Sequence, residues 1–309
     1  MGRWEGTRFC LEYMEKKIRI ITHSGTFHAD ELLAVAALEI YLAGKPYEVI
    51  RTRDPNIIET GDFVVDVGSI YDPATNRFDH HQHGGAGARE NGIPYSSFGL
   101  VWKHYGEAIS GSKEVARAID EQIGHPVDMG DNGLDYYGLV RLDTEPLILQ
   151  FVVAMFRPTW KGGATHDERF LELIPFMRRI LELTMQVERD KQEGEKFVIE
   201  AYAKAEDKRV IVIDGSYPWQ DVLAEHPEPL YVVKPKNQNT FWEVECVRDN
   251  PHGFANRKNL PEAWAGRRDA ELSQITGVPD AVFCHNKRYI AVTETKESAM
   301  KLAQMALNA

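Results

Sequence analysis

The chain has 309 residues, of which 43% are hydrophobic and 27% are charged, and its net charge at pH 7 is −11. This length is typical of two domains, and the apolar content excludes a globally disordered chain. The acid excess disfavours simple electrostatic binding to nucleic acid. The acid excess is uneven along the chain. From Tyr231 on there are 11 Lys and Arg and 9 Asp and Glu, whereas residues 1–230 contain 25 Lys and Arg and 38 Asp and Glu. An acidic first lobe suits cation binding, although solubility alone also explains it.

Sequence features that would direct the chain to a membrane or out of the cell are lacking. No apolar run reaches the ~20 residues that a membrane-spanning helix needs. The first seventeen residues mix four basic with three acidic side chains, which argues against a secretory or mitochondrial signal. Cys10, Cys246 and Cys284 have no paired metal-type spacing and suit a reducing compartment. We therefore expect a cytoplasmic protein with no membrane partner, and both a monomer and a homodimer stay open.

The first half of the chain alternates predicted strands and helices. Strands are expected at residues 18–22, 47–50 and 63–67, with a helix at 29–42 and an extended segment at 77–81 before a glycine-rich loop. Further helices are expected at 96–105 and 113–123, followed by a loop at 128–133. This alternation predicts a parallel α/β sheet covered on both faces.

The second half has a different pattern. Residues 167–204 are helical in spacing, with a break expected near Gly194. Strands follow at 209–213, 230–233, 241–247 and 281–283, the middle two as a hairpin around 235–240, and a helix covers 295–307. The predicted fold is α/β, with a parallel-sheet catalytic domain (18–165), a helical connector (166–205) and a smaller α+β C-terminal domain (206–309).

Histidine and aspartate gather in the first third of the chain, where five of the eleven histidines lie between His23 and His83. His23, Asp66 and residues 79–81 each follow an apolar strand, and the carboxyl ends of parallel strands converge. Imidazole and carboxylate together favour Mn²⁺, Fe²⁺ or Zn²⁺. A lysine or a helix N-terminus is the alternative partner for the buried acid of Asp66. Asp128 and Asp131 can equally be turn formers.

Four motifs occur in a specific order: residues 23–31 (HSGTFHADE), 64–68 (VVDVG), 78–82 (FDHHQ) and 131–133 (DNG). In this combination the chain resembles the Myg family, a branch of the DHH phosphoesterase superfamily. The resemblance continues through residues 51–55, 158–160, 251–254, 261–268 and 275–277, and so covers nearly the whole chain.

The resemblance implies a two-metal site, commonly with manganese. The ligands implied for one ion are His23, His28 and Asp66. Those implied for the other are Asp30, Asp66, His80 and Asp131. Asp79 would orient its neighbours. His28 stands where most DHH phosphoesterases have an aspartate, as in Myg relatives, which favours a transition metal over Mg²⁺.

The implied chemistry is hydrolysis of a phosphate ester. Two divalent ions activate a water for in-line attack, so no side-chain nucleophile is required. Asp66 would be shared by both ions and His81 would face the substrate phosphate. Arg53, with Arg51, is expected to donate to the developing charge. The alternative for both arginines is a structural ion pair with Asp54 and the acidic lobe.

Residues 248–268 combine arginines with aromatic side chains, as single-stranded nucleic acid requires. The residues expected to bind substrate are His252, Arg257, Arg267 and Arg268. The alternative is that Phe254 and Trp264 pack the core. DHH-associated lobes usually carry a Gly-Gly pair where this chain has Ile290–Thr293, so close approach of the backbone to a phosphate is not expected there.

Eukaryotic Myg relatives resemble 3′–5′ RNA exonucleases, so the expected activity is removal of nucleotides from single-stranded RNA. Two alternatives stay open. One is hydrolysis of a small phosphate compound, such as a short oligonucleotide, a cyclic dinucleotide or pyrophosphate. The other is a non-catalytic binding protein that retains the fold.

Overall fold

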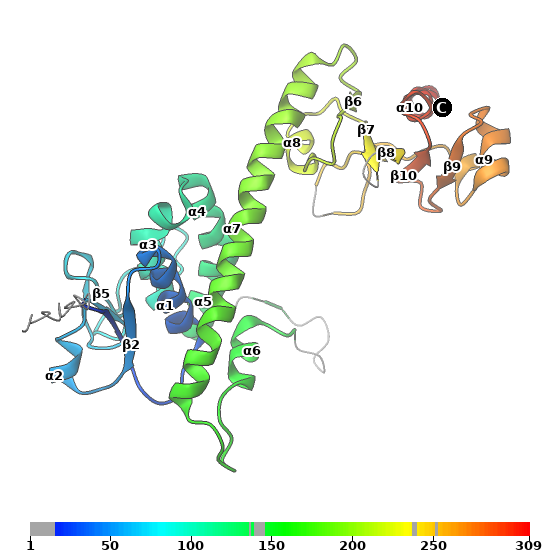
Figure 1. Ribbon diagram of the computed structural model, residues 1–309. Coiled ribbons are helices and arrows are strands. Elements are labelled where there is room, and N and C mark those ends of the chain that lie inside the picture. Colours follow the sequence, from blue (N-terminus) through cyan, green and yellow to red (C-terminus); the bar gives the residue numbers. More distant parts are fainter. Residues whose placement is uncertain (1–15, 136, 139–145, 237–239, 251–252) are drawn as a thin grey trace, which may run out of the picture. The chain divides into compact units, whose positions relative to one another are not determined.

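The computed structural model describes residues 16–309 except 136, 139–145, 237–239 and 251–252. Within it the chain divides into two compact units, one ending at Glu188 and the other beginning at Arg189. Each unit contains one five-stranded sheet (Figure 1). None of the helices in the described residues is long and apolar enough to cross a membrane.

The sheet of the first unit has the strand order β2-β1-β3-β5-β4. Its strands are β1 (Ile18–Thr22), β2 (Tyr47–Arg51), β3 (Phe63–Val65), β4 (Tyr71–Asp72) and β5 (Arg77–Phe78). The first three and β5 run parallel, while β4 is antiparallel to β5. The predicted parallel α/β sheet is therefore confirmed, and the carboxyl ends of β1, β2, β3 and β5 lie at the same edge of the sheet.

The first unit also contains several helices. They are α1 (Ala29–Leu42), α2 (Pro55–Ile58), α3 (Ser97–Ser110), α4 (Lys113–Ile119), α5 (His125–Asp131) and α6 (Leu149–Met155), with a 3-10 turn at Pro73–Thr75 and a π-helical turn at Asp120–Gly124. Helices α1 and α3 pack on each other over the core side of the sheet, where Ile20, Val65 and Phe78 are buried. A smaller cluster of Ile21, Val64 and Val67 covers the opposite face.

The expected loop at residues 128–133 is wrong, because residues 125–131 form helix α5. The turn-like composition is overridden by tertiary contacts of a buried acid. Asp128 accepts hydrogen bonds from the hydroxyl of Ser96 at 2.5 Å and from Arg89 at 2.7 Å. These contacts fix the segment against the start of α3.

Helix α7 (His166–Lys204) is continuous, so the expected break near Gly194 is also wrong. The glycine serves close packing instead, because a Cβ atom at position 194 would lie 2.6 Å from Cδ of Pro218. The first turns of α7 bury Phe170, Leu173 and Met177 in the core of the first unit. The boundary between the two units falls within this helix.

The sheet of the second unit has the order β6-β7-β8-β10-β9 and is antiparallel except for the β6–β7 pair. Its elements are β6 (Val210–Val212), α8 (Gln220–Ala224), β7 (Tyr231–Lys236), β8 (Phe241–Cys246), a 3-10 turn (Glu262–Trp264), α9 (Asp269–Thr276), β9 (Ala281–Cys284), β10 (Ile290–Thr293) and α10 (Lys296–Asn308). The predicted β7–β8 hairpin is present, with residues 237–239 of its turn outside the described part. Ile290–Thr293, which contains no Gly-Gly pair, forms β10 and lies between β8 and β9 in the sheet.

Candidate metal centre

A cavity of about 1070 Å³ opens in the first unit where β1, β3 and β5 end and α1 begins. Its wall contains most of the residues singled out in the sequence: His23, His28, Asp30, Arg53, Asp66, Asp79, His80, His81 and Asp131. Parallel strands bring these distant motifs together because their carboxyl ends lie side by side. The cavity therefore lies at the carboxyl ends of the parallel strands, and helices α1 and α5 add Asp30 and Asp131 to its wall.

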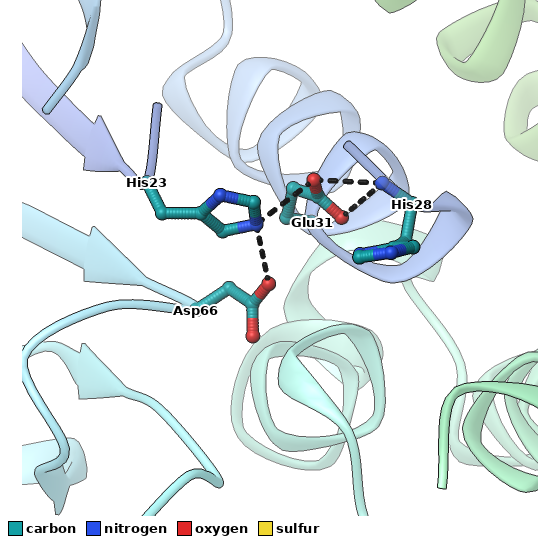
Figure 2. Close-up of side chains that lie close together, drawn as sticks. All are labelled: His23, His28, Glu31 and Asp66. Carbon is teal, nitrogen blue, oxygen red and sulfur yellow. Dashed lines mark hydrogen bonds and ion pairs between the residues drawn. The ribbon is translucent and has the colours of Figure 1, made fainter. Parts of the chain in front are cut away.

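His23 directly follows β1 and points its ring between two acids (Figure 2). Its Nδ1 lies 3.2 Å from the Ser24 carbonyl, and its Nε2 lies 3.2 Å from both Oδ2 of Asp66 and Oε1 of Glu31. Burial alone would lower the pKa of His23, but its contacts with Asp66 and Glu31 raise the pKa to about 10. The position between the two carboxylates thus favours a positive charge, whether a proton or a metal ion.

Asp66 follows β3 in the left-handed backbone region, with φ of 57°. For a residue other than glycine this conformation costs about 1–3 kcal/mol, and such strain gathers at functional sites. Its Oδ2 faces His23, whereas its Oδ1 lies 3.3 Å from Nε2 of His80. Burial alone would raise the pKa of Asp66, yet these two imidazoles hold it well below its usual range.

His80 meets two carboxylates without forming a hydrogen bond to either. Its Nε2 lies 3.2 Å from Oδ2 of Asp131 and 3.3 Å from Oδ1 of Asp66, and it has no hydrogen-bond partner among the described residues. A charge-assisted hydrogen bond is shorter, about 2.7–2.9 Å. Two atoms bound to one ion at about 2.0–2.2 Å lie roughly 3.0–3.5 Å apart. The spacing therefore fits ligands of a shared ion.

Asp30 supplies a second unpartnered atom at the same place. It is buried on the first turn of α1, and its Oδ1 has no hydrogen-bond partner in the described part of the chain. Burial, reinforced by the charges of Asp66 and Asp131, raises the pKa of Asp30 well above its usual value. A buried carboxylate without a counter-charge is costly, so the donor set fits bound cations.

Three groups of side chains bring ligand atoms within 4.8 Å of one another. They are His23, His28, Glu31 and Asp66; Asp66, His80 and His81; and His28, Asp30 and Asp131. The site can therefore bind metal. Six of these residues are those that the motifs indicated as ligands, while Glu31 was not among them.

His81 is held differently from its neighbour His80. Its Nδ1 lies 2.8 Å from Oδ1 of Asp79, which also accepts a hydrogen bond from the His81 backbone at 3.1 Å. The backbone N–H of Ser69 donates to the other oxygen of Asp79. The Asp79 contact raises the pKa of His81, and the imidazole is 57% exposed toward the cavity. Asp79 thus fixes the orientation of the His81 imidazole.

Arg51, the last residue of β2, and Arg53, two residues beyond it, have separate roles. Arg51 is 2% exposed, pairs with Asp167 at 2.6 Å and stacks over Phe170, so it is a structural residue. Its expected partner Asp54 instead caps α2. Arg53 lines the cavity, where Nη2 lies 3.1 Å from Nδ1 of His23 and Nε donates to the Ser24 carbonyl.

Sequence reasoning missed three residues of the site. Glu31 could have been found from its spacing to His28, which is that of a capping box at a helix start. Arg157 lines the cavity and donates to the Phe27 carbonyl at 2.8 Å; its basic character beside a matched motif was the available signal. Ser97 donates to Asp66 at 2.9 Å, and nothing in the sequence distinguished it from a helix cap.

Comparison with known proteins identifies the family of this chain. Residues 19–307 match a family model, MYG1_exonuc, described as "Uncharacterised protein family (UPF0160)". The chain belongs to this MYG1 family. A MYG1 protein of Schizosaccharomyces pombe is 30% identical, over 96% of this chain and 99% of its own length. Proteins named MYG1 exonuclease from Homo sapiens and Mus musculus are 30% and 32% identical, over 94% of this chain and 85% and 84% of their own lengths.

In the second unit of this MYG1 family member, the residues predicted to bind substrate differ in their surroundings. His252 lies outside the described residues. Arg257 is buried and pairs with Asp249, and its guanidinium donates to the carbonyls of Ala224, His226 and Pro229. These contacts engage the guanidinium within the second unit and stabilise its fold, and the expected role of Arg257 in substrate binding stays a prediction. Arg267 pairs with Glu271, while Arg268 stacks over Phe283 at 4.8 Å.

The two aromatic residues of the segment 248–268 differ in burial. Trp264 is buried in the core of the second unit, as the packing alternative expected. Phe254 is 91% exposed and has Arg248 over its ring at 5.7 Å. Phe254 therefore presents an exposed ring, whereas Phe283 is half-buried beneath Arg268.

Proposed function

We propose that this chain is a metal-dependent phosphodiesterase that removes nucleotides from the 3′ end of single-stranded RNA, using two divalent ions with Mn²⁺ preferred. The observation that carries the proposal is that the two oxygens of Asp66 face different imidazoles, those of His23 and His80. A carboxylate held in this way suits a residue shared by two ions. The name MYG1 exonuclease carried by relatives supports a nucleic-acid substrate.

The side chains that would hold the two ions form two sets that share Asp66. One set is His23, His28 and Asp66, and the other is Asp30, Asp66, His80 and Asp131. The imidazoles favour Mn²⁺ or a similar metal over Mg²⁺, which prefers oxygen ligands. When bound, such ions supply hydroxide near neutral pH and offset the charge of the phosphate oxygens.

The remaining residues of the cavity bind and orient the phosphate. Protonated His81, with Asp79 behind it, donates to a phosphate oxygen. Arg53 and Arg157 add guanidinium donors on the same wall. Preorganised donors of this kind each stabilise a transition state by up to a few kcal/mol.

Single-stranded RNA suits the exposed aromatic and basic pairs of the second unit. A base stacks on an exposed ring with about 1–3 kcal/mol, without requiring a particular sequence. Arg248 beside Phe254 combines such a ring with a phosphate-binding cation, and Arg268 beside the half-buried Phe283 adds a second pair. This supports a flexible single strand over a duplex, whose bases are not available for stacking.

The test is incubation of the Mn²⁺-loaded protein with a 20-nucleotide single-stranded RNA labelled at its 5′ end. The proposal expects a descending ladder and, from a 3′-labelled strand, immediate release of labelled mononucleotide. The matched DNA strand separates RNA from general nuclease activity. Asp66→Asn should remove the activity, while Asp72→Asn, which alters a half-buried acid that caps a 3-10 turn and lies outside the cavity wall, should keep it.

The length of the preferred substrate separates the rival activities. Faster cleavage of a dinucleotide, a cyclic dinucleotide or pyrophosphate than of the 20-mer would replace the exonuclease by a hydrolase of small phosphates. If the RNA stays intact with every divalent metal but still binds to the protein, the chain is a non-catalytic binding protein. The cytoplasmic location stays a prediction that imaging of the tagged protein tests.

A further inference from the structure

The side chain of Glu31 is the one member of the ligand groups that the motifs left without a role. We propose that Glu31 is a direct ligand of the ion held by His23 and Asp66, in addition to capping helix α1. This inference rests on the proposed metal centre and names a further residue of it.

The position of Glu31 is set by the start of α1. His28 is the N-cap residue, and both carboxylate oxygens of Glu31 accept from the His28 backbone N–H, at 2.8 and 2.9 Å. This turns the carboxylate back toward the end of β1, where Oε1 lies 3.2 Å from Nε2 of His23 (Figure 2). The capping interaction thus places the Glu31 carboxylate next to the His23 imidazole.

Burial distinguishes Glu31 from an ordinary capping residue. It is 0% exposed, whereas a capping glutamate needs only to reach back to the backbone and can stay in water. A buried carboxylate requires a positive partner. Among the described residues the ion pair of Glu31 is with His23, and the nearby Arg51 is paired with Asp167. The helix N-terminus offsets part of the charge, but it also serves Asp30.

The spacing around His23 repeats that around His80. Nε2 of His23 is 3.2 Å from Glu31 and 3.2 Å from Asp66, as Nε2 of His80 is 3.2 Å from Asp131 and 3.3 Å from Asp66. Ligand atoms of His23, His28, Glu31 and Asp66 all lie within 4.8 Å of one another. With Glu31, each imidazole faces two carboxylates, of which that of Asp66 is common to both.

Independent evidence for a ligand at this place comes from atoms outside the Glu31 contacts. Oδ1 of Asp30 and Nε2 of His80 are buried and lack hydrogen-bond partners in the described part of the chain. Both belong to the same cavity wall. The wall that holds these two unpartnered atoms also holds His23, His28 and Asp66, the three residues whose ligand atoms group with that of Glu31.

Glu31→Gln separates a capping role from a ligand role. Glutamine serves a capping box as glutamate does, since its amide oxygen accepts from the same backbone N–H. It lacks the negative charge that a metal ligand supplies. A residue that only caps the helix would therefore tolerate the change without loss of metal affinity. Glu39→Gln is the matched control, because Glu39 lies on the same helix and pairs with Arg178 away from the cavity.

The experiment titrates Mn²⁺ into the metal-free full-length protein, followed by calorimetry and by the Mn²⁺ electron paramagnetic resonance signal. We expect Glu31→Gln to weaken one class of sites by about tenfold or more, with an unchanged circular dichroism spectrum, and Glu39→Gln to bind as the wild type does. Wild-type binding in the Glu31→Gln variant would overturn the ligand role and leave the proposed function intact. A wild type that binds no Mn²⁺ would overturn both.

A second measurement keeps the inference testable if Glu31→Gln does not fold. Anomalous diffraction from wild-type crystals soaked in Mn²⁺ locates the ion directly. The ligand role requires a Glu31 oxygen at a bonding distance, about 2.0–2.2 Å. An ion bound by His23 and Asp66 but separated from Glu31 by a water would contradict it.

Discussion

The hydroxyl of Ser97 donates a 2.9 Å hydrogen bond to Oδ1 of Asp66, the same oxygen that faces His80. The backbone N–H of Ser97 also lies 3.3 Å from Oδ2 of Asp30. The first turn of α3 thus contacts two of the buried acids, as the positive end of a helix dipole favours. Ser97 fixes the rotation of the Asp66 carboxylate and so decides which oxygen faces which imidazole.

Ser97→Ala should therefore weaken metal binding without removing a ligand. We expect a loss of about 1.5–3 kcal/mol in unfolding free energy, because a hydrogen bond to a charged group is removed, and about tenfold weaker Mn²⁺ affinity. Calorimetry and urea unfolding measure the two effects. Ser110→Ala is the control, since this buried hydroxyl lies at the other end of the same helix. Equal metal affinity in both variants would contradict the positioning role.

The Asp79–His81 contact predicts the alkaline limb of the pH–rate profile. Asp79 raises the pKa of His81, so the protonated imidazole persists to higher pH than it otherwise would. Activity that needs this proton is lost as the pH rises through that raised pKa. Asp79→Asn removes the main cause of the shift, so the alkaline limb of kcat/KM should move to lower pH, with activity at pH 8 reduced about 10–100-fold. An unmoved limb would exclude His81 as the donor.

Replacing Arg257 or Arg268 by alanine should have different effects, although both residues lie in the segment 248–268. Arg257→Ala leaves buried carbonyls without donors and should destabilise the protein by about 3 kcal/mol or more. Arg268→Ala should raise KM for RNA several-fold with stability and kcat unchanged, because this exposed side chain stacks on Phe283. Urea unfolding and steady-state kinetics separate the two. A raised KM in Arg257→Ala with full stability would reverse the assignments.

Cys246 and Cys284 should not react with thiol reagents at pH 8 in the folded protein. Burial raises the pKa of Cys246 to about 12 and that of Cys284 to about 11, so both stay protonated. Because the folded pKa values lie above the usual 9, the folded state is destabilised relative to the unfolded state as the pH rises above 9. In a Cys10→Ser background, Ellman's reagent should label no thiol in buffer and two in denaturant. Rapid labelling in buffer would contradict the burial of these strands.

The sequence predicted the strand ends and the helix at residues 29–42 because their apolar patterns reflect burial directly. It failed where tertiary contacts override local composition. Asp128 looked like a turn former, but its bonds to Ser96 and Arg89 make residues 125–131 helical. Gly194 looked like a helix break, but its missing side chain admits Pro218.

The candidate site was predicted in its motifs and missed in its supporting contacts. His23, Asp66 and His80 follow strands, so convergence at one sheet edge could be inferred from the chain alone. The roles of Ser97 and Arg157 depend on which segments pack beside that edge, which no local pattern contains. Arg51 and Arg53 are two residues apart, yet only the structure separates the buried ion pair of Arg51 from the cavity position of Arg53.

The most direct test of the metal centre is elemental analysis of the purified full-length protein beside Asp66→Asn, both dialysed against Mn²⁺ and then against metal-free buffer. The account predicts about two equivalents of divalent metal per wild-type chain and a near-complete loss in the variant, with the fold retained by circular dichroism. Wild-type protein that retains no stoichiometric metal, or an Asp66→Asn variant that retains as much as the wild type, would contradict it.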